Sequence, residues 1–135
     1  MPQDRTQPAA LDAVEVLIVE DEYYLADELR LIVEQAGGRV AGPFADAPSA
    51  LAHLDRGRPA CAVIDVNLGG TVSLEVADAL VARAIPFMFL TGYDADALPI
   101  RFAGVERLEK PADLGAVLGK LRVLAGPPID QAAAR

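Results

Sequence analysis

The 135-residue chain predicts an α/β fold in which a parallel sheet carries helices on both faces. Short continuous apolar runs, typical of strands buried on both faces, alternate with segments whose apolar residues recur at three- and four-residue steps. Alternation at this spacing indicates a parallel sheet whose strands are joined by right-handed crossovers. Hydrophobic residues make up 53% of the chain and Trp is absent, so the core should be aliphatic.

The strands and helices can be placed along the chain from the spacing of apolar residues and from the glycine, proline and capping residues that bound them. Strands are expected over residues 14–19, 39–44, 60–64, 86–90 and 105–109. Helices are expected over 22–36, from a cap at Asp46 or Ser49 to residue 54, and over 72–83 and 112–125. Pro43 favours an edge position or a strand end for the second strand. Residues 92–104 are few and contain Pro99, so the fourth helix should be short or irregular.

The length indicates one domain, which we expect over residues 14–125 between flexible tails at 1–13 and 126–135. No apolar run approaches the roughly 18 residues of a membrane-spanning helix. The N-terminal residues are polar and lack the apolar core of a secretory signal. We therefore expect a cytoplasmic protein.

The formal net charge of −8 and the sequence pI of about 4.5 limit the partners of the chain. Nucleic acids and anionic membranes attract basic patches, so neither direct DNA binding nor membrane binding is expected. An acidic protein is instead suited to concentrating a divalent cation. The single cysteine, Cys61, lies in an apolar run and is interpreted as a small buried hydrophobe.

Four of the expected strands end at residues with polar side chains. Glu20 and Asp21 follow the first strand, Asp65 the third, Thr91 the fourth and Lys110 the fifth. In a parallel α/β sheet the carboxyl ends of the strands lie along one edge, where ligands bind. The sequence therefore predicts that these five residues converge in one site.

The three carboxylates of this group indicate a metal site. Glu20, Asp21 and Asp65 would repel one another if they were brought together without a cation. Mg²⁺ prefers oxygen ligands in octahedral geometry. We expect Asp21 and Asp65 to bind it directly, Glu20 through water, and the main-chain carbonyl of Asn67 to complete the set.

A metal-bound Asp65 is also a candidate nucleophile, because a carboxylate can accept a phosphoryl group as an acyl phosphate. Lys110 would supply a positive charge and Thr91 a hydroxyl donor to the transferred group. Each residue also has a simpler interpretation, since acids at strand ends are often solvated and the Glu-Asp pair could stabilise a helix N-terminus. Agreement among the five positions favours the site.

The motifs around these residues resemble those of a response-regulator receiver domain of two-component signalling over about residues 14–125. The resemblance is carried by the segments VLIVEDE at 16–22, VIDVNL at 63–68, LTGY at 90–93 and EKP at 109–111. Any one of these motifs is weak alone, but together they are highly specific.

This resemblance implies a (βα)₅ fold, a doubly wound, flavodoxin-like, five-stranded parallel sheet. It implies phosphoryl transfer from a sensor histidine kinase onto Asp65, with Mg²⁺ held by the three carboxylates and the Asn67 carbonyl. It also implies that Thr91 and Lys110 contact the phosphoryl group.

The chain departs from the receiver pattern three residues before the lysine, where most receivers have an aromatic switch residue and this one has Arg107. Residues 87–93 are similar to the signature of the atypical FATGUY subclass, with Leu90 in place of its alanine. That subclass is associated with sensor kinases of the HWE and related types, and often with receivers that lack an output domain. We expect residues 92–104 to switch by ordering when Mg²⁺ and phosphate reach Thr91.

The function expected is that of a single-domain response regulator, a phosphoacceptor rather than an enzyme. It would act on a downstream protein that the sequence does not identify, through homodimerisation, or as a phosphate sink. One alternative is a haloacid-dehalogenase-like phosphatase, but such enzymes need a second acid where this chain has Asn67. A degenerate receiver acting as a binding module is disfavoured because all five site positions are filled.

Overall fold

The sheet has the predicted parallel α/β architecture. The structure is a computed structural model that describes residues 11–68, 71–72, 74–92 and 98–126. Its five longer strands form one parallel sheet in the order β2-β1-β3-β6-β7. These strands are β1 (Glu15–Val19), β2 (Arg39–Phe44), β3 (Cys61–Asp65), β6 (Phe87–Thr91) and β7 (Glu106–Glu109).

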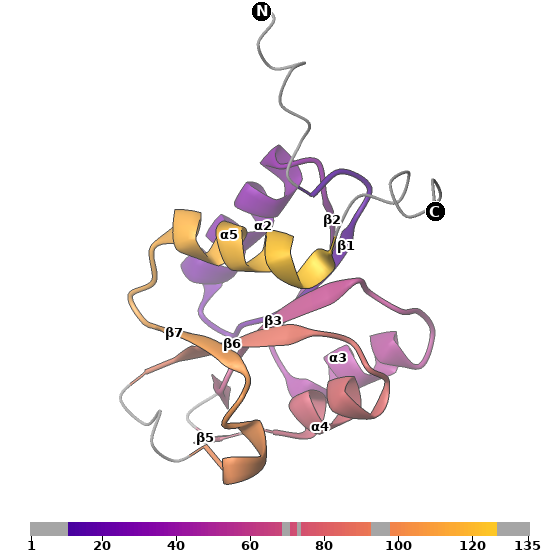
Figure 1. Ribbon diagram of the computed structural model, residues 1–135, viewed down its shortest axis with the longest axis vertical. Coiled ribbons are helices and arrows are strands. Elements are labelled where there is room, and N and C mark those ends of the chain that lie inside the picture. The colour runs from indigo at the N-terminus through magenta and orange to yellow at the C-terminus, as the bar shows by residue number, and fades with distance from the viewer. Residues whose placement is uncertain (1–10, 69–70, 73, 93–97, 127–135) are drawn as a thin grey trace, which may run out of the picture.

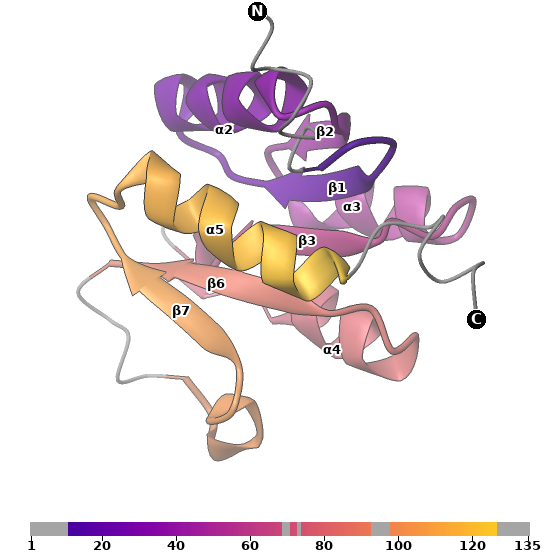
Figure 2. The ribbon, with the colours of Figure 1, turned by 45° about the horizontal axis from the view of Figure 1, so that its top comes forward.

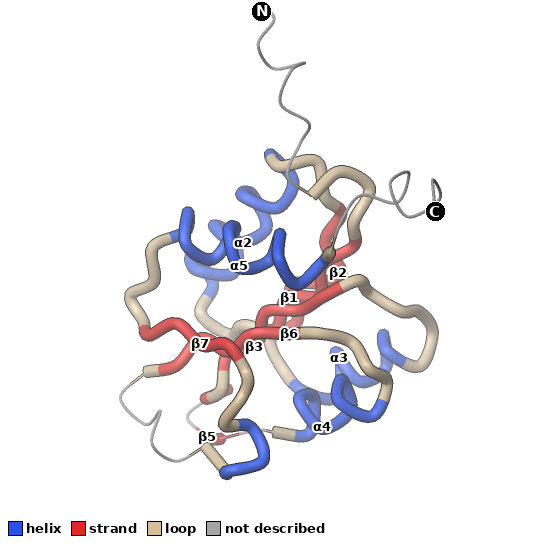
Figure 3. Tube along the Cα trace, viewed as in Figure 1, coloured by secondary structure: helices blue, strands red, loops and turns tan. Residues whose placement is uncertain are grey.

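In the described part of the chain, four helices cover the sheet in two pairs. α2 (Tyr23–Gln35) and α5 (Leu114–Ala125) lie on one face, and α3 (Ala47–Leu54) and α4 (Glu75–Ala82) lie on the other (Figures 1 and 2). Each face has its own apolar cluster, because alternate strand residues point to opposite sides. The layers therefore enclose two apolar cores, one on each side of the sheet. The helices on either side of the strands can be followed along the tube in Figure 3.

The central strands owe their position to their continuous apolar sequences. Every residue of β3 and β6 is buried, and β1 is buried from Val16 onward. β2 and β7 form the two edges and are more exposed, as Pro43 predicted for β2. Gly42 adopts a φ of 101° before a cis bond to Pro43, and a Cβ there would lie 2.6 Å from the Phe44 nitrogen. Only glycine fits this bend.

Local hydrogen bonds define the helix starts. Of the two caps left open by the sequence, Asp46 is the one used: its Oδ1 accepts a bond from the Ser49 N–H at 2.8 Å. Asp113 similarly accepts a bond from the Gly115 N–H at 3.3 Å and begins α5. Each cap satisfies a backbone N–H of the first helical turn, whereas among the described residues α2 and α4 begin without a side-chain cap.

The expected helix over 72–83 begins later than its apolar spacing suggested. Val72 lies in β5 (Thr71–Val72), which pairs antiparallel with β4 (Asn67–Leu68). Thr and Val are β-branched and fit an extended ladder better than a first helical turn. The helix itself, α4, begins at Glu75.

The folded unit also includes Leu11, which the sequence analysis assigned to the N-terminal tail. Leu11 is fully buried, and its N–H donates a hydrogen bond to the Ala36 carbonyl at 2.9 Å. Residues 1–10 and 127–135 lie outside the described residues, so the expected flexible tails stay predictions there.

The β6–β7 connection agrees with the expected short or irregular fourth helix. Its described residues contain a single 3₁₀ turn, η2 (Ile100–Phe102), and Phe102 is buried. The remainder, residues 93–97, lies outside the described part, including Tyr93 of the subclass signature.

Candidate functional site

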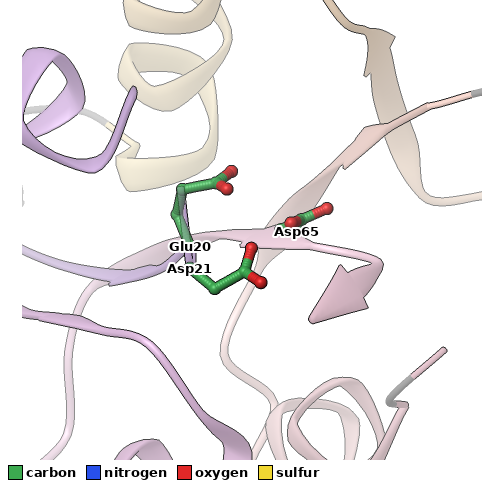
Figure 4. A group of neighbouring side chains, drawn as sticks. All are labelled: Glu20, Asp21 and Asp65. Carbon is green, nitrogen blue, oxygen red and sulfur yellow. The ribbon is translucent and has the colours of Figure 1, made fainter. Parts of the chain in front are cut away.

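The predicted convergence of acids is present at the carboxyl ends of β1 and β3. These strands are neighbours, with Val19 opposite Ile64, so Glu20 and Asp21 follow directly beside Asp65. One oxygen from each of the three carboxylates lies within 4.8 Å of the others. Figure 4 shows the three side chains facing a common space beyond the strand ends.

Two of these acids are buried and one is exposed. Glu20 is 2% exposed and Asp65 is 3% exposed, whereas Asp21 reaches the surface. Burying carboxylates costs free energy unless positive charge and hydrogen bonds compensate for the lost water. The site must therefore contain compensating groups.

Lys110 supplies the positive charge. Its Nζ lies 3.1 Å from Glu20 Oε1 and 3.2 Å from Asp65 Oδ2, so one ammonium bridges both buried acids. The Glu20 Oε2 atom accepts hydrogen bonds from Lys110 Nζ at 3.2 Å and from the Glu22 N–H at 3.0 Å. Among the described residues, the close Glu20 Oε1 atom accepts no bond of good geometry.

Burial, hydrogen bonds and neighbouring charges shift the pKa values of Glu20 and Lys110. Burial raises the pKa of Glu20 from 4.5 to about 7, against the Glu22 hydrogen bond, and the Asp65 charge adds to the rise. Burial would lower the pKa of Lys110, but its bonds to Glu20 and the charges of Glu20 and Asp65 outweigh burial and raise it. The ammonium therefore stays charged beside acids that repel one another.

The donor set fits a hard divalent cation. Three carboxylates against one ammonium leave two formal negative charges when all groups are ionised. Glu20 Oε1 is buried without a hydrogen bond in the described part of the chain, and Asp21 is exposed towards solvent. Oxygen ligands with excess negative charge and open access match the preferences of Mg²⁺.

Thr91 and Asn67 stand at the same edge of the sheet. Thr91 is buried at the end of β6, next to Leu90, which pairs with Asp65. Its carbonyl accepts the Lys110 N–H at 2.7 Å, which ties the ends of β6 and β7 together. Asn67 begins β4 two residues after Asp65. The roles expected for the Thr91 hydroxyl and the Asn67 carbonyl stay predictions.

The sequence analysis did not predict a pocket of about 360 Å³ beside Lys110. Its wall is formed by the start of α2, by Gly92 after β6 and by the loop that leads into α5. Several of these residues belong to the motifs, but the motifs carry no signal for the space between them. The lining residues are Glu22, Tyr24, Leu25, Glu28, Gly92, Lys110, Pro111 and Ala112. The pocket gives the Lys110 side of the site an opening to the surface.

Arg107 lies where the receiver pattern has its aromatic residue, and it is exposed on β7, opposite Phe89. No aromatic ring of β7 therefore packs beneath the site.

None of the helices in the described part of the chain has the length and apolarity that a membrane crossing requires.

Comparisons with known proteins agree with this architecture. The solution structure of SdrG from Sphingomonas melonis Fr1 is 38% identical, with a TM-score of 0.71 over 85% of this chain and 97% of that chain. A second SdrG structure, from Pseudomonas melonis Fr1 in the BeF₃-activated conformation, is 39% identical, with a TM-score of 0.67 over 83% and 98% of the two chains.

Two curated proteins are also similar. The phyllosphere-induced regulator PhyR of Methylorubrum extorquens is 32% identical over 124 residues, which are 83% of this chain and 45% of PhyR. The sensory transduction protein RegX3 of Mycobacterium tuberculosis is 29% identical over 113 residues, 81% of this chain and 49% of RegX3. The chain thus spans about half the length of these curated relatives. The family model for the response regulator receiver domain matches residues 16–122, and the chain belongs to this family.

Proposed function

We propose that this receiver domain accepts a phosphoryl group on Asp65 from the phosphohistidine of a sensor histidine kinase. The observation that carries the proposal is the Lys110 ammonium, which lies 3.1 Å from Glu20 Oε1 and 3.2 Å from Asp65 Oδ2. This arrangement holds one buried carboxylate beside a fixed positive charge at the carboxyl edge of a parallel sheet. It supports Asp65 as the nucleophile and Lys110 as the group that balances the arriving charge.

Glu20, Asp21 and Asp65 would hold Mg²⁺, together with the main-chain carbonyl of Asn67. When bound, the ion would neutralise the excess negative charge of the acids and that of the phosphoryl oxygens. Burial first, and then the charge of Asp65, raise the pKa of Glu20 to about 7, and this supports the role because a bound cation would offset both effects.

In the proposed step, an Asp65 carboxylate oxygen forms a bond to phosphorus while the phosphorus–nitrogen bond of the donor histidine breaks. The imidazole leaves with the bonding electron pair, and the chain needs no general base. Lys110 and Thr91 would both contact the phosphoryl oxygens, the ammonium through its positive charge and the hydroxyl as a hydrogen-bond donor.

We place this domain with single-domain response regulators of the FATGUY type. SdrG, which this chain covers over 97% of its length, and the exposed Arg107 support this placement. A kinase of the HWE type is the proposed phosphodonor. The output would be binding to a downstream protein, homodimerisation, or drainage of phosphate from a shared kinase.

The test uses the full chain, Mg²⁺ and a small phosphoramidate donor, and measures acid-labile phosphate by intact-protein mass spectrometry. Asp65→Asn should abolish the label, whereas Asp55→Asn, at an exposed acid paired with Arg83, should keep it. At most one phosphoryl group per chain is expected. A label that survives in Asp65→Asn, or sustained turnover of para-nitrophenyl phosphate, would contradict the proposal.

A further inference from the structure

The β6–β7 connection packs on the face of β6 that carries Thr91. Phe87, Phe89 and Thr91 alternate along β6 and so share one face of the sheet. The Phe102 ring, from η2, packs edge-on against both phenylalanines, with centroids 5.5 Å from Phe89 and 6.4 Å from Phe87. Phe102 is 1% exposed. An aromatic ring therefore does pack on the face of β6 that Thr91 shares, but it comes from the connection rather than from β7.

The residue before Phe102 in η2, Arg101, joins the connection to α4. Arg101 Nε lies 3.0 Å from Asp78 Oδ1, and its Nη2 lies 3.0 Å from Oδ2 of the same carboxylate. The guanidinium also lies over the Phe102 ring, 4.7 Å from its centroid. A two-bond contact between planar groups fixes orientation as well as distance. Asp78 belongs to the helix that follows the Asp65 strand.

We propose that Arg101 and Asp78 form a coupling pair that transmits the phosphorylation state of Asp65 from Thr91 to α4. This inference rests on the proposed function and concerns its regulation. A Thr91 hydroxyl drawn towards a phosphoryl group shifts the end of β6, and with it the face of β6 on which Phe89 lies. The buried Phe102 follows the face it packs on, and the Arg101–Asp78 contact carries the displacement into α4.

Because the Arg101–Asp78 pair is exposed, its effect on coupling can be tested separately from its effect on folding. Arg101 and Asp78 side chains are 55% and 51% exposed. Exposed ion pairs contribute little to the free energy of unfolding. Removing the contact should therefore leave the fold and the acid site intact while it disconnects α4 from the connection.

The experiment records amide NMR spectra of the full chain in Mg²⁺, with and without beryllofluoride. The variants are Arg101→Gln and Asp78→Asn. The matched control is Arg30→Gln, which removes a similar arginine that pairs with Asp27 and Glu34 within α2. Shifts at Asp65 and Thr91 report binding, and shifts across Glu75–Ala82 report coupling.

In both variants we expect beryllofluoride still to bind, with an affinity within about fivefold of the wild type because coupling between two sites is reciprocal, and a thermal midpoint within a few degrees of the wild type. The α4 shifts should fall about two- to fivefold, the range that the coupling of an exposed ion pair corresponds to. The control should keep the full α4 response, and the charge swap Arg101→Asp with Asp78→Arg should restore part of it.

The coupling pair is overturned if the α4 shifts are equal in the wild type and in both variants. It is also overturned if beryllofluoride shifts the Thr91 amide of the wild type but leaves the α4 amides unchanged. The proposed function fails separately if the wild-type Asp65 and Thr91 amides do not respond to beryllofluoride at all.

Discussion

The two faces of the sheet bring different kinds of side chain to the site. On the α2/α5 face, Glu20 continues the alternation of Val16 and Ile18, and Asp65 that of Cys61 and Val63, so buried acids extend an apolar cluster. On the α3/α4 face, Thr91 extends the alternation of two phenylalanines in the other cluster. One face holds fixed charge, and the other holds packed rings and a neutral hydroxyl.

This difference separates binding from response. Buried charges cost free energy that only a partner charge or cation offsets, so the α2/α5 face is prepared for a ligand at the expense of stability. Aromatic packing contributes stability in any ligand state. Substitutions on the two faces should therefore have effects that differ in kind.

Removing the bridging ammonium should have the largest effect on stability. Lys110→Met leaves the buried Glu20 and Asp65 without their shared cation, and we expect a loss of about 3 kcal/mol in the free energy of unfolding without Mg²⁺. Urea unfolding followed by circular dichroism measures the change.

The matched control for this prediction is Lys120→Met, at an exposed pair with Glu106 on the surface of α5. Its loss should be at most about 0.5 kcal/mol. Equal midpoints for the two variants would mean that the buried acids do not depend on Lys110.

The pH dependence of the free energy of unfolding should show the titration of Glu20. Its pKa is about 7 in the folded protein, above the ordinary 4.5, so the folded state holds this proton more tightly. The resulting stabilisation is complete below pH 4.5 and is lost as the pH rises through about 7. Without Mg²⁺, we expect the chain to lose about 2 kcal/mol between pH 5 and pH 8.

Urea midpoints at several pH values test this expectation. Glu20→Gln cannot ionise and should flatten the profile, and saturating Mg²⁺ should flatten it in the wild type. A wild-type profile that rises between pH 5 and pH 8 would show that other groups dominate.

On the opposite face, Phe102→Leu should destabilise the protein without changing its metal site. The smaller side chain leaves a gap against Phe87 and Phe89, and we expect a loss of about 1.5 kcal/mol. Mg²⁺ affinity, measured by calorimetry, should match the wild type. Ile100→Ala, at a side chain 90% exposed on the same turn, should have almost no effect on stability. Weakened Mg²⁺ binding in Phe102→Leu would mean that the two faces are not separable.

The parallel sheet and the acid cluster were predictable because both follow from local patterns. Continuous apolar runs defined the strands, and a parallel sheet places the residues after each strand at one edge. The convergence of Glu20, Asp21, Asp65 and Lys110 at one edge of the sheet was therefore predicted correctly.

The start of α4 and the role of Phe102 were not predictable in the same way. Val72 suits both a helix and a strand, and only its pairing with Asn67 decides between them. The packing of Phe102 against Phe89 depends on contacts made by a connection whose own sequence pattern is weak. Such tertiary contacts leave no periodic signal in one sequence.

The smallest expected effect concerns the charge of Asp65 itself. Without Mg²⁺, Asp65→Asn removes a carboxylate that helps to raise the pKa of Glu20, while Lys110 keeps its contact with Glu20. The gain from lost repulsion should exceed the lost Lys110–Asp65 attraction, because one ammonium serves several acids. We expect the variant to be more stable by about 1 kcal/mol. Adding Mg²⁺ should reverse the order, since a cation that binds only the folded wild type raises its urea midpoint. If the variant has the lower midpoint in the absence of Mg²⁺, then Asp65 is held by attraction to Lys110 more than it is strained by its neighbouring acids.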